Sequence, residues 1–364
     1  MPQGDLDDPI ISMTEKLRFL GMLLDVPSPI ETHSSYVFVS RDRALKMKKP
    51  VRLGRMDHRS LAAREHACRE ELRLNRQLAA DVYRGLVALV IEPSGQLALG
   101  GHGKIVDWLI DMRCLPADRM LDEILRRGDR PTAVEMDALA ARLVSFYRAR
   151  QAEPARPGVY LRHLLQESGV NTQHLLQMQS HLGTADIAKL TSRAEALIVQ
   201  HREEIMQRDT DRLIVEGHGD LRPEHICLVD PVVIFDRIEF SSELLMIDVF
   251  DEANYLGIEC AGLGTPGIGP AIIAKLQEAG FSAPSPKLLT AYGLFRCLTR
   301  ARLAIDHLRE PSPRTPQKWP RQSAAFLARA ADLLDAHLTG RSHGGGGANA
   351  ARICVTSRLE TCGK

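Results

Sequence analysis

The sequence predicts an α+β fold in which a small, mostly antiparallel β lobe precedes a large helical lobe. One observation is a series of short β-branched runs separated by polar turns before Pro116. The second is the dominance of helical periodicity after Pro116, interrupted by one strand–loop–strand segment at 213–235. A run of strands followed by a run of helices is typical of α+β architecture.

The predicted β lobe begins with a short amphipathic helix over 13–23. Pro50 ends the second strand because proline cannot donate to a sheet ladder. Ser60 can cap a long helix over 60–79, whose apolar positions recur at helical spacing. The strands are expected at 35–40, 43–48, 85–91, 96–99 and 105–110.

The predicted helical lobe contains most of the remaining chain. Helices are expected at 119–128, 132–150, 159–182, 185–208, 243–257, 269–279, 285–308 and 320–339. We therefore expect a β-rich lobe over 1–112 and a helical lobe over 113–338. The tail over 339–364 contains four consecutive glycines from Gly344 and lacks apolar periodicity, so it is predicted to be disordered.

Composition excludes several classes of protein. The 364 residues are 44% hydrophobic and 26% charged, as in ordinary soluble globular proteins, and the net charge is +1. No global field attracts the chain to nucleic acid or to an anionic membrane. No secretory signal or bilayer-spanning run is evident. The seven cysteines form no CxxC pair, so we expect neither a zinc site nor a disulfide framework, and a cytoplasmic location.

Two aspartates carry the clearest chemical signal. Asp220 lies in a Gly-Asp turn, and Asp236 follows the apolar run Val232–Phe235. The chain between them is long enough for a hairpin that brings both carboxylates to one cleft. Phosphoryl transfer needs such a pair, because one carboxylate orients the attacking hydroxyl and takes its proton while the other holds magnesium. Aspartate oxygens suit that hard cation.

The motifs around these aspartates resemble those of a known family. His218-Gly-Asp-Leu-Arg-Pro-Glu-His225 is similar to the HGDxxxxN catalytic loop of aminoglycoside phosphotransferases and related small-molecule kinases, and Ile234-Phe-Asp236 resembles their metal-binding motif. The resemblance implies a protein-kinase-like two-lobe fold, with Asp220 as catalytic base and Asp236 as principal metal ligand. It also implies that Asp248 and Asp251 support the site from the following helix.

In the β lobe, the resemblance extends to Ala44-Leu-Lys46, which has the form of the kinase strand whose lysine contacts the α- and β-phosphates. Lys48 lies on the same face of that strand and is the alternative. The glutamate partner is expected from the next helix, with Glu71 preferred over Glu70.

The resemblance also implies further nucleotide contacts. Asp107 and Leu109 fall where the inter-lobe hinge and the adenine contacts would lie, and Ser34 falls in the phosphate-covering loop, which here contains no glycine. The acids Asp251, Glu252 and Glu259 could meet a cationic acceptor.

Position 225 departs from the family motif. His225 stands where the family has asparagine, the second metal ligand. Imidazole suits softer ions than magnesium, so the metal is expected to be Mg²⁺ or Mn²⁺, held by Asp236 and His225.

The segments from Glu31 to Val39 and from Leu45 to Val51 resemble the phosphotransferase-like domain that precedes a P-loop kinase domain in bacteria. The chain contains no GxxxxGK[ST] motif. A separate P-loop kinase domain protein is therefore an expected partner.

These observations predict an ATP-dependent phosphotransferase that acts on a hydroxyl of a small molecule. Two alternatives remain open. One is a pseudokinase that binds nucleotide without turnover, favoured by His225 and by the glycine-free loop. The other is a metal-dependent hydrolase that uses His218, Asp220, His225 and Asp236 as ligands, which leaves Lys46 unexplained.

Overall fold

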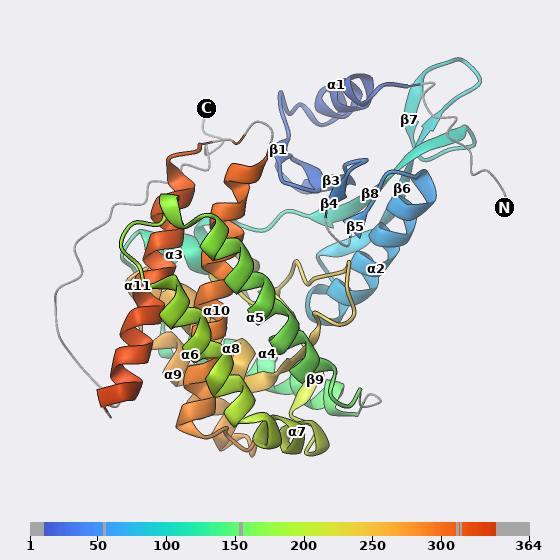
Figure 1. Ribbon diagram of the computed structural model, residues 1–364. Coiled ribbons are helices and arrows are strands. Elements are labelled where there is room, and N and C mark those ends of the chain that lie inside the picture. The colour runs from blue at the N-terminus through green and yellow to red at the C-terminus, as the bar shows by residue number, and fades with distance from the viewer. Residues whose placement is uncertain (1–10, 54–55, 153–155, 311–312, 314, 340–364) are drawn as a thin grey trace.

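The computed structural model describes residues 11–53, 56–152, 156–310, 313 and 315–339. A β lobe and a helical lobe lie side by side, as Figure 1 shows. This confirms the predicted α+β, kinase-like two-lobe fold. The predicted tail over 339–364 falls, from residue 340 onward, outside the described residues.

The β lobe contains a six-stranded antiparallel sheet in the order β1-β2-β3-β8-β6-β7. β3 and β8 are adjacent in the sheet although α2 (Leu61–Ala79) and four strands separate them in sequence. The strands are β1 (Ile30–Glu31), β2 (Ser35–Val39), β3 (Arg43–Lys48), β6 (Tyr83–Ile91), β7 (Leu97–Leu99) and β8 (Lys104–Arg113). The short strands β4 (Arg52–Leu53) and β5 (Met56–Asp57) form a separate pair. β1, β4 and β5 were not expected from the sequence.

Two helices contribute to the hydrophobic clusters of the sheet. α1 (Met13–Leu24) packs Leu20 against a cluster that includes Leu45, Met47 and Leu109. α2 (Leu61–Ala79), capped by Ser60 as expected, packs Cys68 into another cluster with Ile110 of β8. Because side chains alternate along a strand, Lys46 and Lys48 point away from the Leu45 and Met47 cluster and toward α2. The alternation thus places two basic side chains beside Glu71.

The helical lobe has two hydrophobic clusters. One lies mainly among α5, α6, α10 and α11, and the other mainly among α3, α4, α8 and α9. The helices are α3 (Leu121–Arg126), α4 (Ala133–Gln151), α5 (Val159–Gln177), α6 (Ile187–Gln200), α7 (Arg202–Thr210), α8 (Val249–Gly262), α9 (Ile268–Glu278), α10 (Pro286–Asp306) and α11 (Lys318–Thr339). The helix expected over 185–208 is two helices, α6 and α7, with His201 between them.

Two small β pairs position the motif residues. β10 (Ile226–Cys227) and β11 (Val233–Ile234) form the expected hairpin between the two aspartates. β9 (Ile214–Glu216) pairs with β12 (Met246–Asp248). The prediction of helix from residue 243 was therefore wrong for β12. A short, fully buried apolar run has no periodicity that separates strand from helix, and pairing with β9 decides the outcome.

The described helices include none that is long and apolar enough to cross a membrane. β8 ends at Arg113, one residue beyond the proposed end of the β lobe. The cluster that contains Cys68 and Ile110 also includes Cys227 and Val233 of the β10–β11 hairpin, so it joins the two lobes. The β10–β11 hairpin, which lies between the two motif aspartates, consequently packs against α2.

Candidate active site

The turn His218-Gly219-Asp220 is held by one buried glutamate. Glu252 of α8 accepts hydrogen bonds from the backbone N–H groups of His218 at 3.0 Å and Gly219 at 2.7 Å. Gly219 has φ +86°, a conformation that favours glycine. At Gly217, a Cβ would lie 2.4 Å from the side chain of Ile247. The glycines therefore allow the loop to approach α8 and β12 closely.

His218 shapes the same loop. Its Nε2 donates to the carbonyl of Phe235 at 2.8 Å, and its Nδ1 accepts from the Asp220 N–H at 3.3 Å. Burial, followed by the charges of His225 and Arg237, lowers the pKa of His218 to about 3, so the ring is neutral. Both ring nitrogens are bound within the protein. This contradicts the ligand set of the hydrolase alternative, which needs a free nitrogen on His218.

The carboxylate of Asp220 is bound at both oxygens. Tyr255 donates its hydroxyl to Oδ1 at 3.0 Å, and Arg222 Nε donates to Oδ2 at 3.0 Å. Burial raises the pKa of Asp220, but the charges of Arg222 and His225 outweigh burial and hold the pKa well below its ordinary value. Asp220 is therefore an ionised, oriented carboxylate at the end of the motif turn.

Asp236 adopts a left-handed backbone conformation, with φ 63°. Such conformations in residues other than glycine are uncommon and are found at functional sites. Its carboxylate Oδ1 lies 2.8 Å from Lys46 Nζ, and its side chain is 41% exposed. Loss of solvent around the carboxylate raises the pKa of Asp236. The charges of Lys46 and His225 outweigh this effect, so the pKa lies well below its ordinary value. Asp236 thus presents one charged oxygen to a lysine while remaining open to solvent.

Lys46 binds the predicted glutamate. Its Nζ lies 2.7 Å from Glu71 Oε1, so one ammonium joins Glu71 of α2 to Asp236. Burial lowers the pKa of Lys46, but Asp236 and Glu71 raise it further, and the ammonium stays charged. Glu70, the other candidate, pairs with Arg73 on the helix surface. The preferred pair of Lys46 and Glu71 is therefore present.

Lys48 forms a second pair behind the first. Its Nζ lies 2.5 Å from Glu71 Oε2 and also contacts Glu239 Oε1. The Lys48 side chain is 1% exposed, against 13% for Lys46. Glu71 therefore lies between two lysines, only one of which reaches Asp236. Lys48 is placed as an internal support of the site.

His225 bridges the two aspartates. Its Nδ1 lies 2.8 Å from the backbone carbonyl of Asp220, and because a carbonyl only accepts, Nδ1 carries the proton. In the neutral ring, Nε2 is then unprotonated, and it lies 3.6 Å from Asp236 Oδ2. Arg222 Nη2 also approaches Nε2, at 3.4 Å. An imidazole lone pair and a carboxylate oxygen thus converge, which is a donor set that fits a divalent cation.

Arg237 fixes the segment that carries Asp236. Its fully buried guanidinium donates to the carbonyl of Gly217 at 2.6 Å, to the carbonyl of Leu74 at 3.0 Å and to Gln77 Oε1 at 2.6 Å. Its backbone N–H donates to Asn75 Oδ1 at 2.9 Å. Arg237 therefore joins α2 to the loop that follows β9, directly beside Asp236.

Three predicted nucleotide contacts lie outside this group of charges. The carboxylate of Asp107 is buried and pairs with Lys16 Nζ at 2.9 Å and Arg64 Nε at 2.8 Å, which ties α1 and α2 to β8. Leu109 is buried in the α1 cluster with Leu45, and so faces away from Lys46. The contacts of Asp107 and Leu109 are those of structural residues, and nucleotide binding by Asp107 or Leu109 stays a prediction.

Ser34 lies in the loop before β2, where its carbonyl accepts from the Lys49 N–H at 2.7 Å. Its phosphate contact likewise stays a prediction.

The acids at and after the start of α8 are mostly structural. Asp248 pairs with Arg208, and Asp251 pairs with Arg296, in agreement with the supporting role expected of both. Asp251 and Glu252 are fully buried, so the suggestion that they meet a cationic acceptor was wrong. Glu259 forms an ion pair with Arg300 at 2.7 Å and retains a partly exposed side chain.

Sequence reasoning missed three residues that contact the motif groups: Arg222 and Tyr255 on Asp220, and Glu239 on Lys48. Arg222 and Glu239 each lie within three positions of a motif aspartate, which is a signal that could have identified them. Tyr255 could have been found from helical spacing, because it lies one turn after Asp251 on α8.

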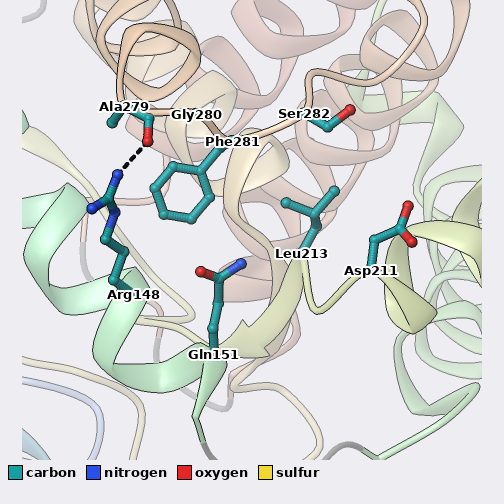
Figure 2. Close-up of a pocket in the computed structure, with 8 residues that line it drawn as sticks. All are labelled: Arg148, Gln151, Asp211, Leu213, Ala279, Gly280, Phe281 and Ser282. Carbon is teal, nitrogen blue, oxygen red and sulfur yellow. Dashed lines mark hydrogen bonds between the residues drawn. The ribbon is translucent and has the colours of Figure 1, made fainter.

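A separate hollow of about 550 Å³ lies where the ends of α4, α7 and α9 meet, and Figure 2 shows it. Its charged residues are Arg148, which donates to the carbonyl of Ala279, and Asp211. None of the residues that line it is a predicted site residue. The candidate site is therefore the cluster around Asp236, where acids, lysines and a histidine converge.

Comparison with curated proteins finds uncharacterized proteins of Mycobacterium tuberculosis and Mycobacterium bovis. The chain is 29% identical to them over 294 residues, which are 78% of this chain and 55% of theirs. The chain thus spans about half the length of the curated relatives it matches. A comparison with protein-family profiles finds no match.

Solved structures with a similar backbone include a choline/ethanolamine kinase family protein from Mesorhizobium loti (TM-score 0.47, 15% identity, 86% of this chain and 90% of that chain). Another is a spectinomycin phosphotransferase in complex with ADP and spectinomycin (TM-score 0.43, 11% identity, 90% and 99%). A third is an aminoglycoside-3′-phosphotransferase of type VIII (TM-score 0.42, 14% identity, 75% and 91%). All three are named as small-molecule kinases or phosphotransferases, the class that the sequence motifs resemble.

Proposed function

We propose that this chain is a small-molecule phosphotransferase that transfers the γ-phosphate of ATP to a hydroxyl of a small acceptor. The observation that carries the proposal is that the carboxylates of Glu71 and Asp236 both bind the Lys46 ammonium, while His225 links Asp236 to the Asp220 turn. A lysine ordered by a helix glutamate, a metal-binding acid and a second carboxylate on a hydrogen-bonded turn are the groups that phosphoryl transfer needs.

Each residue has a role that follows from its contacts. Lys46, oriented by Glu71, would contact the α- and β-phosphates when nucleotide displaces its bond to Asp236. Asp220, held by Tyr255 and Arg222, would accept a hydrogen bond from the acceptor hydroxyl and orient it toward the phosphorus. His218 and Glu252 would keep the turn in place. Catalysis on this proposal is mostly positioning, as expected for phosphoryl transfer.

The residues present fit a divalent cation. Asp236 Oδ2 and His225 Nε2 would hold it, because a partly exposed carboxylate oxygen and an imidazole nitrogen lie 3.6 Å apart. When bound, Mg²⁺ or Mn²⁺ supplies charge neutralisation to the nucleotide phosphates. A nitrogen ligand favours Mn²⁺ more than the all-oxygen set of the family motif does.

Thermal unfolding with ATP, in the presence and absence of Mg²⁺ or Mn²⁺, tests nucleotide binding. We expect a metal-dependent rise in Tm for wild type that disappears in D236N. A ligand at a hundredfold excess over its Kd stabilises the folded state by about 2.7 kcal/mol. The matched control is D230N, which changes an exposed aspartate in the turn of the same hairpin. No shift with any nucleotide and metal would overturn the proposal.

A nucleotide-binding protein without turnover is the second candidate. It is favoured by the binding of both Asp220 oxygens and by the low pKa that follows, which makes Asp220 a weak base. ATP consumption with a panel of hydroxylated acceptors separates the two functions. Turnover that D220N removes, while its ATP-dependent Tm shift remains, supports the kinase. Binding without turnover on any acceptor supports the second candidate.

We also propose that the β lobe ends at residue 112 and the helical lobe begins at residue 113. We further propose a P-loop kinase domain protein as a partner. The end of β8 at Arg113 supports the first. Co-purification of the chain with a P-loop kinase domain protein would test the second.

A further inference from the structure

A cluster of two histidines and a glutamate lies at the contact between the lobes, outside the Asp236 site. His33 comes from the loop between β1 and β2, and His307 and Glu310 follow α10. Figure 1 shows β1 beside the end of α10 where these segments meet. Each residue offers one ligand atom, and these atoms lie within 4.8 Å of one another.

We propose that His33, His307 and Glu310 form a zinc-binding site that joins the β lobe to the helical lobe. Glu310 Oε1 lies 3.4 Å from His33 Nδ1 and 3.1 Å from His307 Nδ1, so one ion between these three atoms would meet one nitrogen of each ring. The Nε2 atoms, on the other edge of the two rings, are 3.4 Å apart. A tetrahedral zinc ion with bonds of about 2.0–2.1 Å requires ligand atoms about 3.4 Å apart. Two imidazoles and one carboxylate, with a fourth position open to water, form a ligand set that zinc uses.

The surroundings hold two of the three ligands in position. The His307 ring stacks on the Trp319 ring of α11, with 3.6 Å between centroids and 5° between planes. On the other side, Lys49 Nζ binds the carbonyl of Thr32 at 2.5 Å and Glu31 Oε1 at 2.6 Å, which orders the loop that carries His33. The half-exposed ring of His33 leaves a path for the ion to enter.

The site would couple zinc to the arrangement of the lobes. His33 precedes Ser34, and both lie in the loop predicted to cover phosphate. An ion bound to residues of both lobes stabilises only the state in which the lobes are together, so zinc should raise the Tm of the whole chain. Zinc binding at this site does not depend on the proposed function.

The test is titration of the full chain with ZnCl₂ alone, followed by calorimetry and by thermal unfolding. We expect one equivalent to bind and to raise Tm. H33N and E310Q, which change partly exposed side chains, should each weaken binding by roughly tenfold or more. The matched control H102N, in the exposed turn before β8, should bind as wild type does. Co²⁺ in place of Zn²⁺ should give the visible spectrum of a nitrogen- and oxygen-ligated tetrahedral site.

Controls separate this site from other zinc ligands in the chain. D236N reports on the His225 and Asp236 pair, and a cobalt spectrum with thiolate character reports on cysteine. The proposal is overturned if no zinc binds, if H33N and E310Q bind as tightly as wild type, or if D236N rather than H33N removes binding.

Discussion

Lys46 and Lys48 lie on the same face of β3 and bind the same glutamate, yet they occupy different environments. Lys46 contacts Glu71 and Asp236, whose side chain is 41% exposed, whereas Lys48 contacts Glu71 and Glu239, whose side chain is 9% exposed. The two lysines have the same chemistry and nearly the same neighbours. The comparison shows that access to solvent, and not the ion pair itself, separates a group that can meet a ligand from one that only supports the fold.

The largest expected effect is on stability when Lys48 is changed. K48M leaves the carboxylates of Glu71 and Glu239 close together in a buried site with only Lys46 to compensate them. Removal of one partner from a buried ion pair costs about 3–5 kcal/mol. Urea unfolding followed by circular dichroism measures the loss, with K104M at an exposed position of β8 as the control.

A double variant sharpens this result. K48M/E239L removes both charges of the inner pair and should recover part of the stability that K48M loses, because an apolar pair avoids the buried charge. A K48M variant that loses less than about 1 kcal/mol would show that Lys48 is not a buried support.

The second prediction concerns ligand binding. K46M should remove the metal- and ATP-dependent stabilisation, about 2.7 kcal/mol at a hundredfold excess of ligand over its Kd. The unfolding free energy without ligand should fall less than in K48M, because Asp236 can be solvated and Glu71 keeps Lys48. Thermal unfolding with and without ATP measures both quantities. Equal loss of ligand-free stability in K46M and K48M would contradict the comparison.

The third prediction concerns pH. Burial, followed by the charge of Lys48, lowers the pKa of His58 from 6.5 to about 4. The pKa of His58 is lower in the folded than in the unfolded state, so below pH 6.5 the unfolded chain binds the proton more readily. The free energy of unfolding is therefore highest above pH 6.5 and falls as the pH falls toward 4. Between pH 6.5 and about 5 the loss from this residue should be about 2 kcal/mol.

Urea unfolding at about pH 7 and pH 5 measures this loss. H58Q should show a weaker pH dependence, and so should K48M, while K46M should not. An unchanged pH dependence in H58Q would show that other groups cause it.

The smallest expected effect is at Tyr83. Its hydroxyl lies 3.4 Å from the Asp236 N–H, which is a long hydrogen bond between the sheet and the Asp236 segment. Y83F should lower the unfolding free energy by about 0.5–1 kcal/mol, the lower part of the range for a neutral hydrogen bond. Urea unfolding of the variant checks this value, and a variant as stable as wild type would show that the bond contributes nothing.

The sequence predicted the elements that depend on local signals. The β2–β3 hairpin, the helix capped by Ser60 and the motif hairpin all have such signals, and all are present. The resemblance to the kinase strand and the helix after it implied a pairing of Lys46 with Glu71, and the two side chains are in contact. The two hairpins and the helix require only signals from residues that are near in sequence.

What the sequence did not predict depends on contacts between distant segments. Met246–Asp248 became a strand because β9 was available to pair with it, and the run itself has no periodicity. Leu109 was assigned to a nucleotide contact from its order in the chain, but the side of the sheet on which it lies became clear only once α1 was placed. Lys48 was an alternative to Lys46, and the different exposure of their second partners, Asp236 and Glu239, separates their environments.

Arg237 has a consequence for how this molecule could be switched. α2 carries Glu71, which orders Lys46, and on the next turns it also carries the carbonyl of Leu74, Asn75 and Gln77, which hold Arg237 beside Asp236. A rotation of α2 that withdrew Glu71 from Lys46 would also pull on the segment that carries Asp236. Because both Lys46 and the Asp236 segment are held by α2, a movement of this helix would displace both parts of the site together.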